Sequence, residues 1–255
     1  MDLGLKGKTV IVTGGAKGIG SGICRVFAQE GANVVVNYRS QPERCETFAR
    51  EIAVQTGAHT VAVQGDVGLE DDVVRIFQTA IDAFGQVDVL VNNAGICPTS
   101  NIWEMELSEW EQVQRTNLTG VFLMSRAMVR HLLAREATGA IVNISSKAGV
   151  SSTTKGRVGY NSSKAGVIGF TKALARDVTQ YGIRVNALLP GFVRNERTET
   201  RLRQEPEFMA SRMLRVPIGR LGEPEDMGHM VAMLASEQSM FAIGSIVDMT
   251  GGLLL

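Results

Sequence analysis

A short β-branched run near the N-terminus leads into Thr13-Gly14-Gly15-Ala16-Lys17-Gly18-Ile19-Gly20, a glycine-rich turn that opens the first helical pattern. Its spaced glycines permit a sharp turn, a close approach of the backbone to a pyrophosphate, and tight packing of helix on strand. The free N–H groups at the start of the helix favour an anion there. A glycine-rich turn without a ligand is the alternative for an isolated match, but the strand–turn–helix context predicts a dinucleotide site. The residues expected to form it are Gly14, Lys17, Gly18, Ile19 and Gly20.

Short apolar or β-branched runs alternate with longer helical patterns along the chain. Several runs are apolar at consecutive positions, which is typical of strands covered on both faces of a parallel sheet. The predicted strands are Thr9–Thr13, Val34–Asn37, Thr60–Gln64, Val87–Val91, Ala140–Ser145, Arg184–Leu189 and Ser245–Met249. The predicted helices include Ile19–Gln29, Arg44–Thr56, Glu70–Phe84, Ser108–Arg135 and Ser162–Tyr181. We therefore expect an α/β fold of Rossmann type, a doubly wound, seven-stranded parallel sheet with helices on both faces.

Glycines follow these helical patterns at the positions where a left-handed residue commonly ends a helix. These expected C-caps are Gly31, Gly57, Gly85, Gly139 and Gly182.

The chain of 255 residues suits a single domain spanning residues 1–255, because α/β domains reach this size. One segment, residues 194–216, interrupts the strand–helix rhythm and carries six arginines and four glutamates. A solvated surface helix is the general interpretation of such a charge run. Its position after a strand's carboxyl end favours a substrate lid here.

The overall composition excludes several classes of protein. The 26 basic residues balance 26 acidic ones, so we expect no nucleic-acid partner and no attraction to an anionic membrane. The three cysteines form no C-x-x-C pair, and the three histidines lie far from them, so neither a disulfide framework nor a metal site is expected. The N-terminus lacks a signal-peptide pattern, and no run is long enough for a membrane helix. A soluble, cytoplasmic protein is expected.

The end of the second predicted strand distinguishes between the two nicotinamide cofactors. Enzymes that use NAD(H) place an acid there to bind the ribose 2′-hydroxyl, whereas this chain has Asn37-Tyr38-Arg39-Ser40. Arg39 can pair with a 2′-phosphate, and Lys17 can add a second cation. Arg39 as an ordinary surface residue is the alternative. The sequence favours NADP(H) over NAD(H).

Tyr160 and Lys164 are four residues apart at the start of a predicted helix, so their side chains share one face. A phenol titrates near about 10 and is a poor proton shuttle at neutral pH. A neighbouring ammonium favours the phenolate, and lowering the pKa by about three units requires about 4 kcal/mol, which a close pair can supply. We expect Lys164 to lower the pKa of Tyr160 in this way.

These motifs together resemble the signature of the classical short-chain dehydrogenase/reductase family, in its order and approximate spacing over almost the whole chain. The matching residues are Thr13–Gly20, Asp66-Val67, Asn92-Asn93-Ala94-Gly95, Asn117, Ser146, Tyr160-Asn161-Ser162-Ser163-Lys164 and Pro190-Gly191.

The resemblance implies roles for these residues. Tyr160 exchanges a proton with the substrate oxygen, Lys164 also holds the nicotinamide ribose, and Ser146 hydrogen-bonds the substrate oxygen. Asn117 holds a water in a relay to Lys164. The cofactor is expected to contact Asp66, Val67, Asn93, Ala94, Gly95 and Val193. Ser145, next to Ser146, leaves the serine assignment ambiguous, because alternate strand residues face opposite ways.

The chain departs from the family pattern at some positions. Asn195 stands where a threonine commonly contacts the nicotinamide carboxamide. Family members usually form homotetramers through the helices around residues 108–135 and 162–181 and the last strand. We expect the same here.

The substrate is expected to be a small-molecule carbonyl or alcohol. The pattern resembles bacterial 3-oxoacyl-carrier-protein reductases, which use NADPH. Tyr181 replaces the basic residue with which those enzymes dock the carrier, and Arg135 is a candidate to compensate. Lys147, Lys155 and Arg157 either face the substrate or are solvated.

Other functions remain open. A sugar, polyol or other secondary-alcohol dehydrogenase shares every motif, and a catalytically silent NADPH-binding sensor shares the fold.

Overall fold

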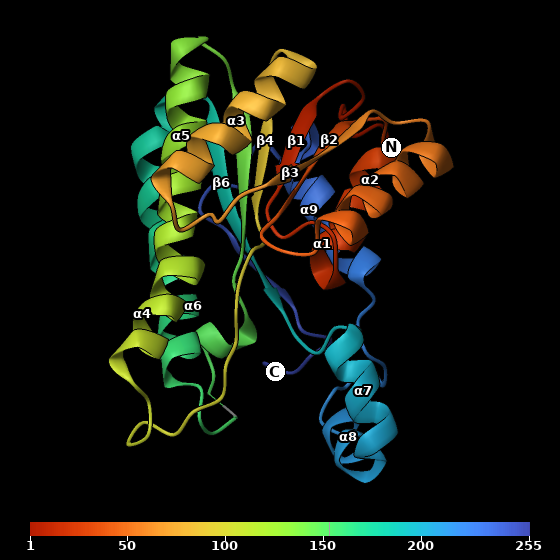
Figure 1. The fold of residues 1–255 in the computed structure, drawn as a ribbon, viewed down its shortest axis with the longest axis vertical. Helices are drawn as coiled ribbons and strands as arrows, with labels where there is room; N and C mark the ends of the chain where they lie inside the picture. The colour runs from red at the N-terminus through yellow and green to blue at the C-terminus, as the bar shows by residue number, and fades with distance from the viewer. Residues whose placement is uncertain (153) are drawn as a thin grey trace.

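Runs of valine, isoleucine and leucine form one sheet of seven parallel strands in the order β3-β2-β1-β4-β5-β6-β7 (Figure 1). The computed structural model describes residues 1–152 and 154–255, with the side chains of Arg197, Pro206, Phe208, Met209 and Arg212 left out of the description. The strands are β1 Thr9–Val12, β2 Asn33–Tyr38, β3 Thr60–Gln64, β4 Val89–Asn92, β5 Gly139–Ile144, β6 Ile183–Pro190 and β7 Ile246–Met249. The predicted fold class is confirmed.

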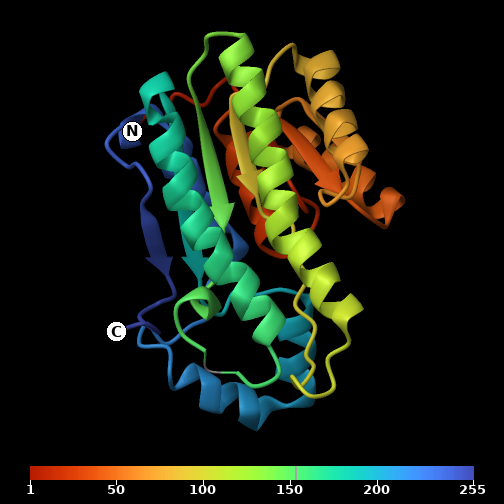
Figure 2. The same cartoon turned by 90° about the vertical axis from the view of Figure 1, so that its left-hand side faces the viewer.

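Helices cover both faces of this sheet. Their bounds are α1 Gly18–Gln29, α2 Pro42–Thr56, α3 Glu70–Phe84, α4 Leu107–Gln114, α5 Gly120–Ala134, α6 Val158–Val178, α7 Glu196–Gln204, α8 Pro206–Met213 and α9 Pro224–Ala235. One buried cluster joins the sheet to α1, α2 and α9, and a second joins its other face to α3, α5 and α6. Figure 2 shows α5 and α6 running next to each other across that second face.

Small residues allow α1 and α9 to lie in close contact. A Cβ atom on Gly22 would lie 2.2 Å from the backbone carbon of Pro224, and one on Gly228 would lie 2.8 Å from the Gly22 carbonyl oxygen. Such distances exclude any larger side chain at Gly22 without movement of a helix.

Several sequence predictions need correction. Gly139 is the first residue of β5 and not a helix cap, because Glu136 with φ 50° makes the turn after α5. Gly31, Gly57, Gly85 and Gly182 do adopt positive φ. Gly139 instead admits the Leu132 side chain, whose Cδ1 would lie 2.7 Å from an added Cβ.

The expected continuous helix over residues 108–135 is interrupted. A π-helical turn, Arg115–Thr119, separates α4 from α5 and carries Asn117. Two other helices also differ from expectation: α6 begins at Val158, and α9 was not among the predicted helices.

The strands' carboxyl ends all lie at one edge of the sheet, toward α7 and α8 (Figure 1). The strand order reverses direction between β1 and β4, and doubly wound sheets bind ligands at such a switch point. The predicted lid segment, residues 194–216, forms α7 and α8 beyond this edge, although the side chains of its Arg197 and Arg212 lie outside the described residues.

Candidate active site

The glycine-rich turn packs against the loop that follows β4. Gly14 has φ +61°, and a Cβ there would lie 3.1 Å from Ala94 Cα. A Cβ on Gly20 would lie 2.3 Å from the Gly14 carbonyl oxygen, so Gly20 lets the helix approach the turn. Asn93 fixes the loop, because its Nδ2 donates to the carbonyl oxygens of Thr13 at 2.8 Å and Gly14 at 3.0 Å. The turn leaves the first N–H groups of α1, which begins at Gly18, at the switch point.

A first pocket opens beside this turn and contains seven of the expected cofactor residues. Its walls include Gly14, Lys17, Arg39, Asp66, Val67, Ala94 and Gly95. Arg39 Nη1 lies 3.9 Å from an Asp66 carboxylate oxygen, and the side chain is 48% exposed. The contact is therefore weak, and a stronger anion can displace it.

Arg44 also lines this pocket, and the sequence reasoning did not select it. It lies in the first turn of α2, and its guanidinium pairs with Glu196 of α7. A basic residue five positions after Arg39, at the start of the helix following β2, was the signal available in the sequence.

A second pocket contains three of the four expected catalytic side chains, without Asn117, together with Ile19, Asn93 and Val193. Ser146, Tyr160 and Lys164 all line it. Ser145 does not compete for the role of Ser146: its Oγ is buried and donates to the Lys164 carbonyl oxygen at 2.8 Å. The Ser146 hydroxyl instead lies close enough to Tyr160 to lower the pKa of its phenol, and its Oγ accepts from the Ala148 N–H at 3.1 Å. The assignment to Ser146 agrees with this geometry.

Lys164 is buried, and its Nζ lies 5.9 Å from the centre of the Tyr160 ring. The ammonium donates to the Ile144 carbonyl oxygen at 2.7 Å. Burial lowers the pKa of Lys164 to about 8, and the nearby Cys97 side chain opposes this shift. Burying the charged ammonium costs free energy. Its hydrogen bond to the Ile144 carbonyl oxygen holds the charge at a fixed position.

The expected effect of Lys164 on Tyr160 is not what the structure gives. Burial raises the pKa of Tyr160 above its ordinary value, and this effect outweighs the hydrogen bond from Ser146, which lowers it. The Cys97 side chain raises the pKa of Tyr160 further, and the Arg157 guanidinium lowers it. Sequence reasoning overestimated the ammonium because it could not evaluate the loss of water around the phenol. Without cofactor, Tyr160 is a protonated phenol at neutral pH.

Asn117 is fully buried in the π-helical turn and joins two parts of the site. Its Oδ1 accepts from the Ile96 N–H at 2.8 Å, while Nδ2 donates to the Ile96 carbonyl oxygen and to Ser163 Oγ. The side chain thus anchors the loop after β4 to α6. Both amide N–H donors are used within the protein, which leaves one lone pair of Oδ1 for a water.

Asn195 serves as the N-cap of α7. Its side chain accepts from the Thr198 N–H at 3.0 Å, and Thr198 Oγ1 accepts from the Asn195 N–H at 2.8 Å. Both residues line the second pocket. The amide of Asn195 therefore fixes the start of the expected lid, a role that its place in the family pattern did not indicate.

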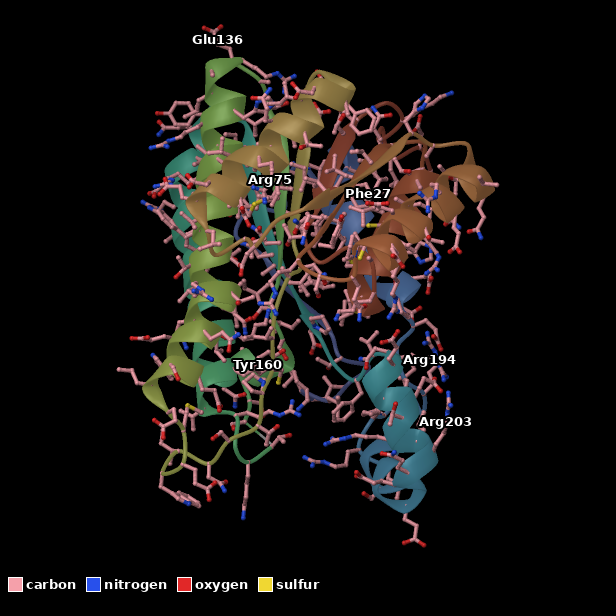
Figure 3. All side chains as sticks on the ribbon, viewed as in Figure 1. Phe27, Arg75, Glu136, Tyr160, Arg194 and Arg203 are labelled. Carbon is pink, nitrogen blue, oxygen red and sulfur yellow. The ribbon has the colours of Figure 1, made fainter. Side chains whose placement is uncertain are left out.

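Arg135, the candidate to replace the missing carrier-docking residue, hydrogen-bonds neighbouring groups of its own chain. Its guanidinium donates to the Val87 carbonyl oxygen at 3.2 Å and to Gln86 Oε1 at 2.7 Å. Figure 3 places the neighbouring Glu136 at the end of the molecule opposite Tyr160.

The two pockets suit a dinucleotide. Gly95 and Ile96 line both, so an extended ligand can pass from one to the other. The buried Oγ1 of Thr116, on the wall of the first pocket, has no hydrogen-bond partner among the described residues. A nucleotide would supply one, and the glycine cradle leaves no space for side chains where its pyrophosphate approaches. Elsewhere in the described chain, no group of three His, Cys, Asp or Glu side chains gathers as metal ligands do.

Comparison with known families and proteins agrees with this geometry. Residues 14–254 match a family model described as "Enoyl-(Acyl carrier protein) reductase". The chain is 40% identical to 3beta-hydroxysteroid dehydrogenase 1 of Eggerthella lenta, over 98% of this chain and 95% of that protein. It is 37% identical to a 3-oxoacyl-(acyl-carrier-protein) reductase of Staphylococcus aureus, over 96% and 98% of the two chains.

Solved structures share the whole fold. A short-chain type dehydrogenase/reductase from Mycobacterium marinum superposes with a TM-score of 0.90 at 32% identity, over 98% of this chain and 96% of that one. A putative 2-deoxy-d-gluconate 3-dehydrogenase from Agrobacterium tumefaciens with bound NADP gives 0.88 at 32% identity, over 98% and 97%. Within the described residues, no helix is both long and apolar enough to span a membrane.

Proposed function

Because this chain belongs to the short-chain dehydrogenase/reductase family, we propose that it reduces a ketone to an alcohol with NADPH, using Tyr160 as the acid. It is an oxidoreductase acting on CH–OH and C=O groups, as its relatives are. The dinucleotide supplies the hydride when it is bound. The single observation that carries the proposal is the meeting of Ser146, Tyr160 and Lys164 in a pocket joined to the glycine-rich turn.

Tyr160 donates its phenolic proton to the carbonyl oxygen as hydride reaches the carbon. A protonated phenol is the form that reduction needs, and burial keeps the pKa of Tyr160 high. Ser146 hydrogen-bonds the same substrate oxygen, because its hydroxyl already lies within reach of the phenol. The two hydroxyls orient the carbonyl before the proton moves.

Lys164 holds the ribose hydroxyls of the nicotinamide half and places positive charge beside the phenolate that forms. Its Nζ, fixed on the Ile144 carbonyl oxygen, is preorganised for this. The proton lost from Tyr160 returns through Lys164 and a water held at Asn117. Because Gly95 has no side chain, the space beside its Cα is open to a water. A Cβ in that space would lie 3.4 Å from Asn117 Oδ1 and 3.6 Å from Lys164 Nζ, which supports a water shared by these two groups.

NADP(H) is the cofactor we propose, with Arg39, Lys17 and Arg44 around its 2′-phosphate. All three line the first pocket. Gly14, Gly18, Ile19 and Gly20 form the pyrophosphate cradle, Asp66 and Val67 border the adenine, and Asn93, Ala94, Gly95 and Val193 border the nicotinamide half. The NADP in the Agrobacterium tumefaciens structure supports this choice.

Dissociation constants for NADPH and NADH test the cofactor choice. Arg39→Ala and Arg44→Ala should each weaken NADPH binding about tenfold or more and leave NADH binding unchanged, since each removes a charge-assisted contact. Arg50→Ala, at an exposed position of α2, is the control. Equal affinities of the wild-type protein for the two nucleotides would refute the phosphate-pairing argument.

We further propose a cytoplasmic homotetramer and a lid formed by residues 194–216. Exposed apolar side chains on α5 and near β7, Phe122, Phe241 and Leu255, support the assembly. The lining of the second pocket by Asn195, Thr198 and Arg201 supports the lid.

NADPH consumption in the presence of 3-oxoacyl thioesters, ketoses, diketones and keto acids tests the activity itself. The proposal predicts loss of nicotinamide absorbance with at least one ketone. Tight binding of NADPH without turnover of any of these carbonyls would favour a sensor instead.

A further inference from the structure

The second pocket is strongly cationic. Besides Lys164, the side chains of Lys147, Arg157 and Arg201 line it, whereas no Asp or Glu does so among the described residues. Most other arginines with a described partner pair with acids: Arg194 contacts Glu199 and Glu223, for example. A pocket that holds the proposed proton donor, and whose described lining contains several cations and no carboxylate, selects for a negative substrate.

Arg157 is the central residue of this cluster. It precedes α6 as its N-cap, and no described residue forms an ion pair or a side-chain hydrogen bond with its guanidinium. Its Nε is buried and has no hydrogen-bond partner among the described residues. A buried N–H without a partner is costly, so a group that arrives with the substrate is the natural acceptor.

Arg157 also lies close enough to the reacting group to matter. Its charge lowers the pKa of Tyr160, three residues further on. Lys147 adds a second cation next to Ser146, held with its Nζ 5.4 Å from the centre of the Phe192 ring. Asn161, also on the pocket wall, has a buried Oδ1 for which the described residues offer no partner, and this suits a substrate hydroxyl.

The phosphates of the nucleotide do not account for Arg157. The pyrophosphate cradle begins α1, which packs on one face of the sheet, whereas Arg157 begins α6 on the other face. Lys155, in the same loop as Arg157, is exposed and does not line the pocket.

We propose that the substrate is a small keto acid whose carboxylate binds the Arg157 guanidinium, with Lys147 beside it, while its ketone faces Tyr160 and Ser146. This rests on the proposed function, because it names the substrate class of that reaction. A guanidinium binds a carboxylate through two parallel hydrogen bonds. Such a pair would raise the affinity for the keto acid and fix the orientation of its ketone.

Matched acids and esters test the proposal on the NADPH-bound enzyme. The probes are 3-oxobutanoate, 4-oxopentanoate and 5-oxohexanoate, each beside its methyl ester. We expect kcat/KM for an acid to exceed that of its ester by about tenfold or more, as removal of a charge-assisted hydrogen bond implies. Arg157→Gln should abolish this preference, Arg157→Lys should restore part of it, and Lys155→Gln should leave it unchanged. Esters reduced as well as acids by the wild-type enzyme would overturn the proposal while leaving the reductase function standing.

A chemical probe gives a second readout that needs no turnover. Cys97 lines the same pocket, whereas Cys24 and Cys45 are buried and burial raises the pKa of both thiols. Iodoacetate and iodoacetamide differ mainly in charge. The ratio of their alkylation rates at Cys97 therefore reports the local preference for an anion, with the same ratio for the thiol of glutathione as the reference. Peptide mass spectrometry identifies the alkylated cysteine.

We expect the ratio of the two alkylation rates to be higher at Cys97 than for glutathione. The ratio should fall at least about threefold in Arg157→Gln, because loss of a nearby positive charge weakens the Coulomb attraction of iodoacetate by about this factor. Lys155→Gln should leave the ratio unchanged. An unchanged ratio in Arg157→Gln would refute the anion site even if the enzyme reduces ketones. Failure of every ketone, with the ratio as expected, would instead refute the proposed function.

Discussion

Replacement of Lys164 by methionine should make the difference in stability between variant and wild type depend on pH. Methionine fills a similar volume without a charge, so the buried ammonium is the main feature removed. Lys172→Met, at an exposed position of the same helix, is the matched control.

The magnitude follows from the pKa of Lys164, which burial lowers from 10.5 to about 8. The unfolded chain binds more protons at this residue than the folded one between these two values, so the free energy of unfolding rises as pH rises through this window. Below pH 8 the full cost of burying the charge is present, and it amounts to about 3 kcal/mol.

Equilibrium urea unfolding of both variants at pH 7 and pH 9.5 measures this effect. Other groups that titrate in this range are shared, so they cancel in the difference. The stability of wild type relative to Lys164→Met should rise by about 2 kcal/mol between the two pH values. A difference that stays constant, or that matches the Lys172→Met control, would refute the claim that Lys164 carries a buried charge.

Two further predictions concern packing and the serine assignment. Gly22→Ala should lower the free energy of unfolding in urea by about 1–3 kcal/mol, because its Cβ would lie 2.2 Å from the Pro224 backbone. Gly169→Ala, whose Cβ would have nothing within 4 Å, should raise it by about 0.5–1 kcal/mol. Equal effects of the two substitutions would contradict the close α1–α9 contact. Ser146→Ala should lower kcat about tenfold or more without loss of stability, while Ser145→Ala should cost about 1 kcal/mol of stability through its hydrogen bond to the Lys164 carbonyl oxygen. The reverse pattern of activity and stability would show that the two serines have been exchanged.

Much of the fold follows from local sequence patterns. Consecutive apolar residues, as in Val34–Val36, identify strands buried on both faces, and all seven predicted strands exist. The spacing of Tyr160 and Lys164 also places both in one pocket. Such features depend on neighbours in sequence, which the periodicity records directly.

Other features depend on contacts that periodicity does not record. The π-helical turn at Asn117 adds a residue to a helix without altering its composition. The pKa of Tyr160 depends on how much water the folded chain removes. Arg157 stands out only because no acid among the described residues pairs with it. The start of helix α9 could have been predicted from the sequence, because Pro224 lies in its first turn and Asp226 belongs to a capping box.

The central claim is that the hydroxyl of Tyr160 delivers the proton. Once a reducible ketone is known, kcat/KM for Tyr160→Phe, measured beside the dissociation constant for NADPH, tests it most directly. We expect a loss of about 10²–10⁴ in kcat/KM with NADPH binding unchanged, as removal of a general acid requires. Full activity in Tyr160→Phe would contradict it.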